Sequence, residues 1–376
     1  MKIGFDGKRA ANNLTGLGNY SRSLIAGLAR LFPQNQYFVY TQRIKNRPQI
    51  SNFFSGRNIT VRMPDRNSLF WRTIGIRKQL INDRIELYHG LSHEIPLNLR
   101  LSGIPAVVTI HDLIFLKFPQ YYGIIDRFIY KQKCRHACKQ ADRIVAISEC
   151  TKKDIITFFD IDPKKIDVVY QSCDDIFRAS ASDEKKAMVR QKFQLPEKYL
   201  LNVGTIEPRK NLLTLIRALP YISETHKLVV VGKATSYAGL VKKEIDRLGL
   251  NSRVAFLRDV AFDELPSIYQ MADIFIYPSE YEGFGIPVIE ALYSGVPAIA
   301  AKGSCLEEAG GPDSIYVDPM DHIGFANAVD RVLHDPGLAK QMKSSGLSYI
   351  GIFEQELLSR KMMDVYAKAV APYTKS

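Results

Sequence analysis

The amino-acid sequence predicts an α/β protein with two doubly wound domains, each built on a parallel sheet. Short runs of β-branched and aromatic residues alternate with segments of helical spacing along most of the chain. A polar stretch at 168–182 interrupts this alternation once, after which it starts again. The length of 376 residues fits two domains. Apolar strands with helices between them are typical of a parallel sheet that is covered on both faces.

The first half of the chain predicts a parallel sheet with helical crossovers. Its strands are predicted at 2–5, 37–40, 59–62, 85–89, 105–110 and 143–147. Its best-defined helices are predicted at 68–81, with Ser68 as N-cap, at 124–139, and at 149–159, with Ser148 as N-cap. The end of this half is placed at residue 171, inside the polar stretch.

Gly16 and Gly18 follow the first predicted strand and precede a helical pattern. They predict a glycine turn whose amides hold a phosphate, with a plain tight turn as the alternative. A dinucleotide-binding fingerprint needs a third glycine three residues after Gly18, and the sequence lacks it. This absence weighs against an NAD-dependent enzyme.

The second half predicts a second sheet. Its strands are predicted at 199–203, 227–231, 254–257, 273–277, 296–300 and 314–317. The domain that carries them is placed at 172–359, and a helical pattern continues at 360–376. Ligands of such sheets bind beyond the carboxyl ends of the strands. The loops after the first, second and fourth of these strands are therefore expected to share one binding site.

The formal charge of +12 is unevenly distributed. Residues 1–171 hold 27 Lys and Arg against 13 Asp and Glu, whereas residues 172–376 hold 24 against 26. An anionic membrane surface or a phosphorylated partner fits the basic half, and no nucleic-acid motif accompanies the charge. Five scattered cysteines, a strand pattern at the N-terminus and the lack of a long apolar run predict a cytoplasmic protein.

The stretch at 279–290 carries the strongest chemical signal. Two glycines permit a sharp turn, and Pro287 suits the first turn of a helix, whose free N–H groups bind an anion. Glu282 and Glu290 would repel a phosphate, so they are expected to accept hydrogen bonds from hydroxyl groups. A sugar–diphosphate–nucleoside has hydroxyl groups on both sides of a phosphate. Solvated glutamates that only compensate the helix dipole are the alternative.

Two sequence patterns resemble the signatures of the family 4 retaining glycosyltransferases. The first is Pro278-Ser279…Glu282-Gly283-Phe284-Gly285…Pro287…Glu290-Ala291, and the second is Gly204…Glu207-Pro208-Arg209-Lys210-Asn211. The resemblance implies the GT-B fold, two Rossmann-like domains facing a central cleft, with the helix at 360–376 crossing back to the first domain. The wording of the second pattern resembles bacterial mannosyl- and rhamnosyltransferases of surface-polysaccharide and lipopolysaccharide assembly.

The expected site residues follow from the patterns and the resemblance together. Those expected to act in catalysis are His111, Asp112, Arg209, Lys210 and Glu282. Those expected to bind the donor are Gly16, Gly18, Gly204, Arg209, Lys210, Gly283, Phe284, Gly285 and Glu290. No metal cluster with ligand spacing occurs, so transfer is expected to be metal-independent, with the leaving diphosphate stabilised by cations.

The expected reaction is retaining transfer of a sugar, with GDP-mannose as the favoured donor, to a glycan or lipid-linked acceptor. The basic first half predicts peripheral contact with the anionic inner face of the cytoplasmic membrane. Two alternatives remain open. One is a nucleotide-sugar epimerase of the same fold, and the other is a non-catalytic, membrane-bound assembly partner.

Overall fold

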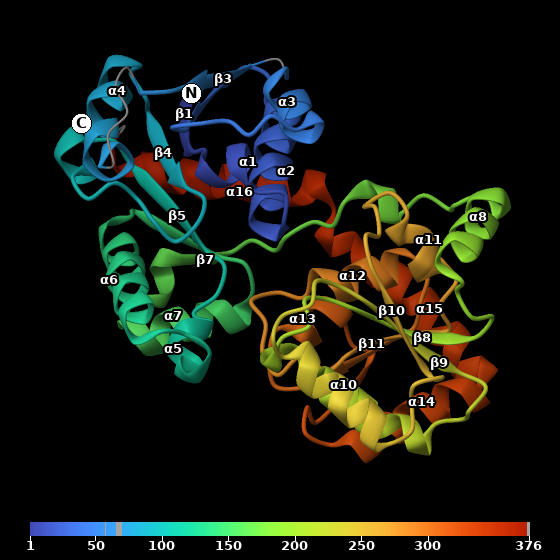
Figure 1. The fold of residues 1–376 in the computed structure, drawn as a ribbon. Coiled ribbons are helices and arrows are strands. Elements are labelled where there is room, and N and C mark those ends of the chain that lie inside the picture. The colour runs from blue at the N-terminus through green and yellow to red at the C-terminus, as the bar shows by residue number, and fades with distance from the viewer. Residues whose placement is uncertain (57, 65–69, 374–376) are drawn as a thin grey trace. The chain divides into compact units, whose positions relative to one another are not determined.

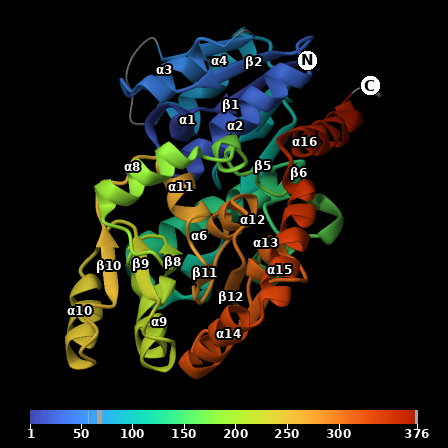
Figure 2. The same ribbon diagram turned by 90° about the vertical axis from the view of Figure 1, so that its right-hand side faces the viewer.

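The computed structural model describes residues 1–56, 58–64 and 70–373. The chain divides into two compact units. The first unit is Met1–Ser172 together with Phe353–Ser376, and the second is Cys173–Ile352. Each unit contains one parallel sheet with helices packed around it (Figure 1, Figure 2), which confirms the prediction of two Rossmann-like α/β domains.

The sheet of the first unit has seven strands in the order β3-β2-β1-β4-β5-β6-β7. Their bounds are β1 (Lys2–Asp6), β2 (Gln36–Tyr40), β3 (Ile59–Arg62), β4 (Leu87–Gly90), β5 (Ala106–Ile110), β6 (Arg143–Ala146) and β7 (Ile166–Val168). The chain runs outward from β1 to β3 and then returns to β4, so the strand order reverses between β1 and β4. The sequence did not predict β7, because this strand has only three residues and leads directly into the polar stretch.

Helices cover both faces of this sheet. They are α1 (Lys8–Asn12), α2 (Gly16–Leu31), α3 (Pro48–Phe54), α4 (Ile76–Asn82), α5 (Ile114–Lys117), α6 (Ile124–Gln140), α7 (Glu149–Phe159) and α16 (Gln355–Val370). Successive residues of β5 point to opposite faces. Val107 packs in the core with α2 and α16, and Val108 packs in the core with α4 and α6.

Two local predictions differ from the structure. Gly16 and Gly18 form the first turn of α2 rather than a separate turn, and a Cβ at Gly18 would lie 1.8 Å from the Asn13 carbonyl oxygen. Close backbone packing therefore requires this glycine. The helix predicted at 68–81 is a π-helical turn (Trp71–Gly75) followed by α4, and its proposed cap, Ser68, lies outside the described residues. Ser148 caps α7 as predicted, by accepting a hydrogen bond from the Thr151 amide.

The last long helix, α16, belongs to the first unit and lies alongside α2 (Figure 1). Its Tyr366 hydroxyl lies 2.7 Å from His89 Nδ1 on β4, and His89 Nε2 lies 2.8 Å from the Thr109 hydroxyl on β5. All three side chains are buried. Burial lowers the pKa of His89 to about 3, so the ring is neutral and depends on these two hydrogen bonds.

The sheet of the second unit has six strands in the order β10-β9-β8-β11-β12-β13. Their bounds are β8 (Tyr199–Val203), β9 (Lys227–Val231), β10 (Val254–Leu257), β11 (Ile274–Tyr277), β12 (Ala298–Ala301) and β13 (Ile315–Val317). The principal helices are α8 (Asp183–Phe193), α9 (Leu212–Ala218), α10 (Ala238–Arg247), α11 (Leu265–Gln270), α12 (Ile286–Tyr293), α13 (Leu306–Gly310), α14 (His322–His334) and α15 (Pro336–Tyr349). Here the strand order reverses between β8 and β11.

Replacing Tyr366 by Phe should destabilise the first unit, because it leaves His89 Nδ1 buried without a partner. The expected loss is about 1–3 kcal/mol in the free energy of unfolding. Tyr373→Phe is the matched control, since its hydroxyl bonds Asp142 on the exposed surface. Thermal and denaturant unfolding should separate the two variants. Equal stability of both would contradict the role given to the Tyr366–His89 contact.

Candidate functional site

Two loops form the best-organised polar site of the second unit. One follows β8 and the other follows β11, so both lie at the carboxyl edge of the sheet where the strand order reverses. The Glu280 amide donates to the Arg209 carbonyl at 2.9 Å, and Asn211 Nδ2 donates to the Pro278 carbonyl at 3.2 Å. Asn211 adopts a left-handed conformation (φ 55°) between a short turn and α9. These bonds join the loops into one wall.

Glu282 lies in this wall with its carboxylate buried between two cations. Arg209 Nη1 lies 2.9 Å from one carboxylate oxygen, and Lys210 Nζ is ion-paired with the other. Ser279 donates a hydrogen bond of 2.6 Å to the same carboxylate. Burial alone would raise the pKa of Glu282, but Lys210 and Arg209 lower it to about 2. The carboxylate is therefore ionised at any physiological pH.

The two cations are held differently. The terminal nitrogens of Arg209 donate to Glu207 Oε1 at 2.7 Å and to the Tyr281 carbonyl at 2.5 Å, in addition to the pair with Glu282. Lys210 Nζ donates to the Tyr277 hydroxyl at 2.5 Å and to Glu282. An ammonium group has three N–H donors, so Lys210 keeps one for a ligand. Arg209 therefore supports the loops, and Lys210 offers the more available charge.

The start of α12 shapes the rest of this loop. Gly285 has a φ of 112°, and a Cβ there would lie 2.7 Å from the Leu306 side chain, so both conformation and space require glycine. The neighbouring Phe284 side chain is buried. Cys305 Sγ donates to the carbonyls of Phe284, at 2.9 Å, and Glu282, at 3.1 Å. The loop at 282–285 is thus held in place by side-chain packing and by the hydrogen bonds of the Cys305 thiol.

Glu290 is half-buried in the second turn of α12 and differs electrostatically from Glu282. It accepts a hydrogen bond of 2.9 Å from the Tyr269 hydroxyl, and no cation is paired with it within the described chain. Burial raises the pKa of Glu290 to about 7, although the Tyr269 hydrogen bond lowers it. The two glutamates of one motif therefore have opposite pKa shifts.

Pockets for small ligands commonly have volumes of about 300–1,000 Å³. A pocket of about 780 Å³ opens at the carboxyl ends of β9 and β10. Its lining includes Ile206, Gly232, Lys233, Lys242, Arg258 and Asp259. A Cβ at Gly232 would lie 1.8 Å from the Gly204 carbonyl, so the β8 and β9 loops touch there. Gly204 was predicted from the sequence to bind the donor, but Arg258 and Asp259 were not. They could have been found from the rule that ligands bind at the carboxyl ends of strands, because both residues directly follow the strand predicted at 254–257.

His111 and Asp112 belong to the first unit, whereas the other predicted catalytic residues belong to the second. His111 is buried, with Nε2 2.8 Å from the Leu91 carbonyl and Nδ1 3.0 Å from Gln171 Nε2. Burial lowers the pKa of His111 to about 3. Since both nitrogens are bound to protein, the ring is a fixed neutral group and is not placed to move a proton. Asp112 accepts a hydrogen bond from the Ile114 amide at 3.1 Å.

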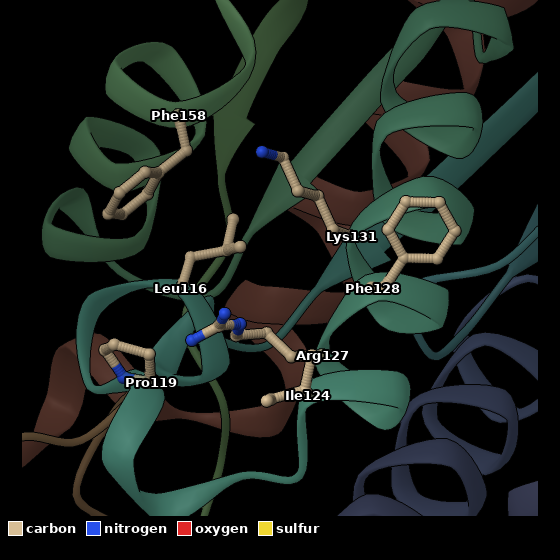
Figure 3. Close-up of a pocket in the computed structure, with 7 residues that line it drawn as sticks. All are labelled: Leu116, Pro119, Ile124, Arg127, Phe128, Lys131 and Phe158. Atoms are coloured by element: carbon tan, nitrogen blue, oxygen red, sulfur yellow. The ribbon is translucent and has the colours of Figure 1, made fainter.

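An apolar groove of about 410 Å³ lies on the first unit beside α6. It is lined by Leu116, Pro119, Ile124, Arg127, Phe128, Lys131 and Phe158. Figure 3 shows Arg127 and Lys131 reaching from α6 across the groove, toward the side of Leu116 and Phe158. The N-terminal half of α6 exposes Ile124, Ile125 and Phe128 by 78%, 75% and 63%. This combination of exposed apolar and basic side chains is typical of a surface that contacts a partner or a membrane.

Within the described residues, no group of three or more His, Cys, Asp or Glu side chains is arranged to hold a metal ion. Cys134 and Cys138 on α6 are both free and buried. Among the described residues, no helix has both the length and the apolar composition needed to cross a bilayer.

Comparison with known proteins agrees with this geometry. Residues 183–348 match the family described as Glycosyl transferases group 1, and residues 14–175 match Glycosyltransferase Family 4. The chain is 27% identical to O-antigen chain mannosyltransferase B of Escherichia coli, over 97% of this chain and 99% of that protein. It is 30% identical to the D-inositol 3-phosphate glycosyltransferase of Salinispora arenicola, over 77% of this chain and 70% of that protein.

A solved structure has the same fold. The chain is similar to the crystal structure of Anabaena Alr3699/HepE in complex with UDP and glucose, with a TM-score of 0.77 and 17% identity. The similarity covers 98% of this chain and 99% of that chain. At this identity the similarity shows the fold alone.

Replacing Glu290 by Gln should change how stability depends on pH. In the unfolded chain Glu290 ionises near its ordinary pKa of 4.5, but in the folded chain it stays protonated up to about 7. Glu290 therefore contributes a loss of stability in the wild type as pH rises from about 4.5 to about 7, and the variant lacks this contribution. The melting temperature of the variant should rise relative to wild type over this range, by about 2–4 °C for each kcal/mol.

The exposed Glu307 provides the control, because Glu307→Gln should follow the wild-type curve at every pH. Melting curves at half-unit pH steps give the comparison. Parallel curves for wild type and Glu290→Gln would contradict a raised pKa at Glu290.

Proposed function

We propose a specific reaction for this chain, which belongs to the group 1 glycosyl transferases of glycosyltransferase family 4. It transfers a hexosyl unit, with mannose favoured, from a nucleotide-diphosphate sugar to a glycan or lipid-linked acceptor. The mannosyltransferase name of the Escherichia coli relative, which is similar over 97% of this chain, supports mannose. The name of the Anabaena structure, which reports bound UDP and glucose, supports a nucleotide-sugar donor.

The observation that carries the proposal is the buried cluster of Glu282, Arg209 and Lys210 at the carboxyl ends of β8 and β11. Breaking the bond from an anomeric carbon to a phosphate oxygen puts negative charge on the leaving diphosphate. Fixed cations in a partly dry site stabilise that charge, because they need no reorganisation during the reaction. Lys210 is the residue best placed for this task, since its ammonium keeps a free donor.

Donor binding would redistribute the contacts of this cluster. A diphosphate that approaches Lys210 competes with Glu282 for the ammonium, which frees one carboxylate oxygen to accept a sugar hydroxyl. Glu282 stays ionised throughout, since Arg209 remains paired with it. Arg209 cannot turn as freely, because Glu207 and the Tyr281 carbonyl also hold it. We therefore assign Lys210 to the diphosphate, Glu282 to the sugar, and Arg209 to positioning both.

The nucleoside would occupy the region from Glu290 to the pocket at β9 and β10. In its ionised form Glu290 can accept hydrogen bonds from both ribose hydroxyls, and these donors favour ionisation of a carboxyl whose pKa is raised to about 7. The 780 Å³ pocket is lined by apolar residues together with charged ones such as Arg258 and Asp259, and it has the size for a nucleobase.

We further propose that transfer retains the anomeric configuration and needs no metal ion. A retaining double displacement needs a carboxylate nucleophile at the reacting carbon. Glu282 is committed to two cations, and Asp112 accepts a bond from the backbone. A front-face reaction, in which the departing phosphate accepts the proton of the acceptor hydroxyl, fits these residues better. Both ring nitrogens of His111 are already bound by protein, so we assign it no proton transfer.

The acceptor is proposed to be lipid-linked and reached at an anionic membrane on the cytoplasmic side. Helix α6 carries five Lys or Arg residues against one acidic residue, together with the exposed Ile124, Ile125 and Phe128. Apolar side chains can enter the headgroup region while the cations contact anionic lipids. Each such cation contributes about 1 kcal/mol near the surface, so binding would be peripheral and salt-sensitive.

Lys210→Ala should reduce transfer by about 10²–10³-fold in turnover, because one preorganised charge on the leaving group is lost. The assay measures release of the nucleoside diphosphate and formation of glycosylated acceptor from GDP-mannose, with a metal chelator present. Lys340→Ala, an exposed lysine on α15, is the control and should keep wild-type turnover.

Near-normal transfer by Lys210→Ala would contradict its role. Donor turnover without an acceptor, with an altered sugar as product, would favour an epimerase. Activity that appears only when manganese or magnesium replaces the chelator would overturn metal independence.

A triple variant of α6, Ile124→Ser/Ile125→Ser/Phe128→Ser, should lose most of its binding to vesicles that contain anionic lipid. Sedimentation at low and high salt measures this binding, and wild type should bind anionic vesicles more strongly than neutral ones at low salt. The control removes three exposed apolar side chains of the second unit, with Met188, Leu240 and Met320 changed to Ser. Equal binding of wild type to neutral and anionic vesicles would contradict the membrane proposal.

A further inference from the structure

We infer that a pocket at the amino edge of the first unit's sheet binds a phosphate monoester of a small polyhydroxy molecule. The pocket has a volume of about 240 Å³, which limits the ligand to a small molecule. The site is independent of the proposed reaction, because no residue assigned to the donor or to catalysis lines it. The polar side chains that line the pocket are those of Arg100, Lys139, Gln140, Asp142, Lys165 and Tyr373.

The pocket lies where three neighbouring strands begin. Ala106 is the first residue of β5, Asp142 directly precedes β6, and Lys165 directly precedes β7. These strands are adjacent and parallel, so all three start at the same edge of the sheet. His111 directly follows β5 at the opposite edge, about 17 Å away for a strand of five residues. The pocket is therefore separate from the carboxyl edge, where ligands of such sheets ordinarily bind.

Three cations and one acid line this pocket. The cations are Arg100, Lys139 and Lys165, and the acid is Asp142. Among the described residues, Arg100, Lys139 and Asp142 form no ion pair. Burial lowers the pKa of Lys165, Asp142 raises it, and the nearby Arg100 lowers it further. The cations thus repel one another, and an anion in the pocket would relieve that repulsion.

Two other cations beside the same strands are already paired with an acid. Arg143, the first residue of β6, lies 2.5 Å from Asp167 Oδ2. Lys368, on α16, lies 2.7 Å from Asp167 Oδ1. The uncompensated positive charge of this region is therefore left inside the pocket, at Arg100 and Lys139.

Lys165 offsets the negative charge that would oppose an anion here. α6 ends at Gln140, and the carbonyl groups of its last turn carry partial negative charge. Lys165 Nζ donates to the carbonyls of Cys138, at 3.0 Å, and Lys139, at 2.9 Å. An ammonium group has three N–H donors, so one is left for a ligand. Lys165 thus neutralises the helix end and can also contact the ligand.

Hydrogen bonds fix the backbone of the segment that carries Arg100. The Leu97 amide donates to the Thr73 carbonyl at 2.8 Å, and Arg77 Nη2 donates to the Leu101 carbonyl at 2.9 Å. Both bonds tie this segment to the helical region that begins at residue 71. A site whose walls are already fixed loses less entropy when a ligand binds.

Asp142 gives the pocket a part that binds hydroxyl groups. Its carboxylate accepts hydrogen bonds from the Ala106 amide, at 2.7 Å, and from the Tyr373 hydroxyl, at 3.1 Å. A carboxylate has about four acceptor positions, so it can accept further bonds from hydroxyl groups. The side-chain amide of Gln140 lines the same pocket and can both donate and accept. A polyhydroxy body beside the phosphate would use both groups.

The cations favour phosphate over a simple carboxylate. A guanidinium can hold two phosphate oxygens at once, and an ammonium adds a point charge beside it. Arg100 provides the guanidinium, and Lys139 and Lys165 provide ammonium groups. Three cations and one acid leave an excess of two positive charges. A phosphate monoester carries about 1.5–2 negative charges at neutral pH and balances this excess, whereas a carboxylate carries only one.

The test is calorimetric titration of glucose 6-phosphate into the full chain, with saturating GDP present to occupy the proposed donor site. The variant is Arg100→Ala/Lys139→Ala, in which both side chains are exposed and can be removed without a core defect. The control, Arg30→Ala/Lys153→Ala, removes the same types of side chain from exposed positions elsewhere in the first unit. Glucose 6-phosphate should bind the variant about tenfold or more weakly than wild type or control, because charge-assisted contacts are lost. Equal affinity of variant and wild type would overturn the inference.

Two further arms identify the ligand. Glucose should bind far more weakly than glucose 6-phosphate, and equal affinity for the two would contradict a phosphate site. Vesicles that contain phosphatidic acid present a phosphate monoester on a lipid. Vesicle binding should be equal in the variant and the control, since the most exposed apolar side chains of α6 lie at its other end. A loss confined to vesicle binding by the variant would assign the pocket to a lipid headgroup and overturn the inference.

Discussion

The ion pairs of the buried Glu282 carboxylate are the interaction on which the site after β8 and β11 depends. An ionised carboxylate is costly to bury unless it is paired and hydrogen-bonded. Arg209, Lys210 and Ser279 provide these partners from two loops that are about 70 residues apart in sequence. The loops after β8 and β11 must therefore lie together for the charge to be tolerated. The same contacts that stabilise the wall also place two cations beside a glycine loop, where an anion can approach.

The reversal of strand order explains why each unit has a polar site at one edge. In the second unit it brings the β8 and β11 loops together, and in the first it brings the β1 and β4 loops together. The residues in these loops differ, however. The second unit balances Lys210 and Arg209 with Glu282 and Glu207, whereas in the first unit no ion pair of Lys8 or Arg43 occurs among the described residues. Part of the excess charge of the basic half thus lies at the carboxyl edge of the first sheet.

The sequence predicted the fold well where elements are long and apolar. Segments such as β5 and β8 were readily predicted as strands, because they are short and mostly apolar. In the structure every residue of both strands is buried. The prediction from the sequence failed at short elements. β7 has three residues and α1 has five, which is too few to show the spacing of apolar residues that is typical of a strand or a helix. The motif at 279–290 was recognisable because its glycines and proline each suit a specific local backbone conformation.

Contacts between distant segments were beyond the reach of the sequence. Nothing in the local pattern indicates that both nitrogens of His111 are bound by Leu91 and Gln171, or that Arg209 is held by the Tyr281 carbonyl. The pairing of cations with acids is also a tertiary property. Lys8 and Lys133 look alike in the sequence, but among the described residues Lys133 forms an ion pair with Glu94 and Lys8 forms none.

The two glutamates of the donor motif show how position alone sets chemistry. Glu282 sits between cations and ionises with a pKa of about 2. Glu290 accepts a hydrogen bond from the Tyr269 hydroxyl, has no paired cation among the described residues, and has a pKa of about 7. Glu282 is therefore a permanent hydrogen-bond acceptor, which suits the sugar-binding role that we propose for it. Glu290 changes state near neutral pH, so a ligand with hydroxyl donors has to ionise it on binding. Part of the binding energy of that ligand is then spent on proton release, so its affinity through Glu290 depends on pH. Contacts with Glu282 do not depend on pH in this way, because Glu282 is already ionised.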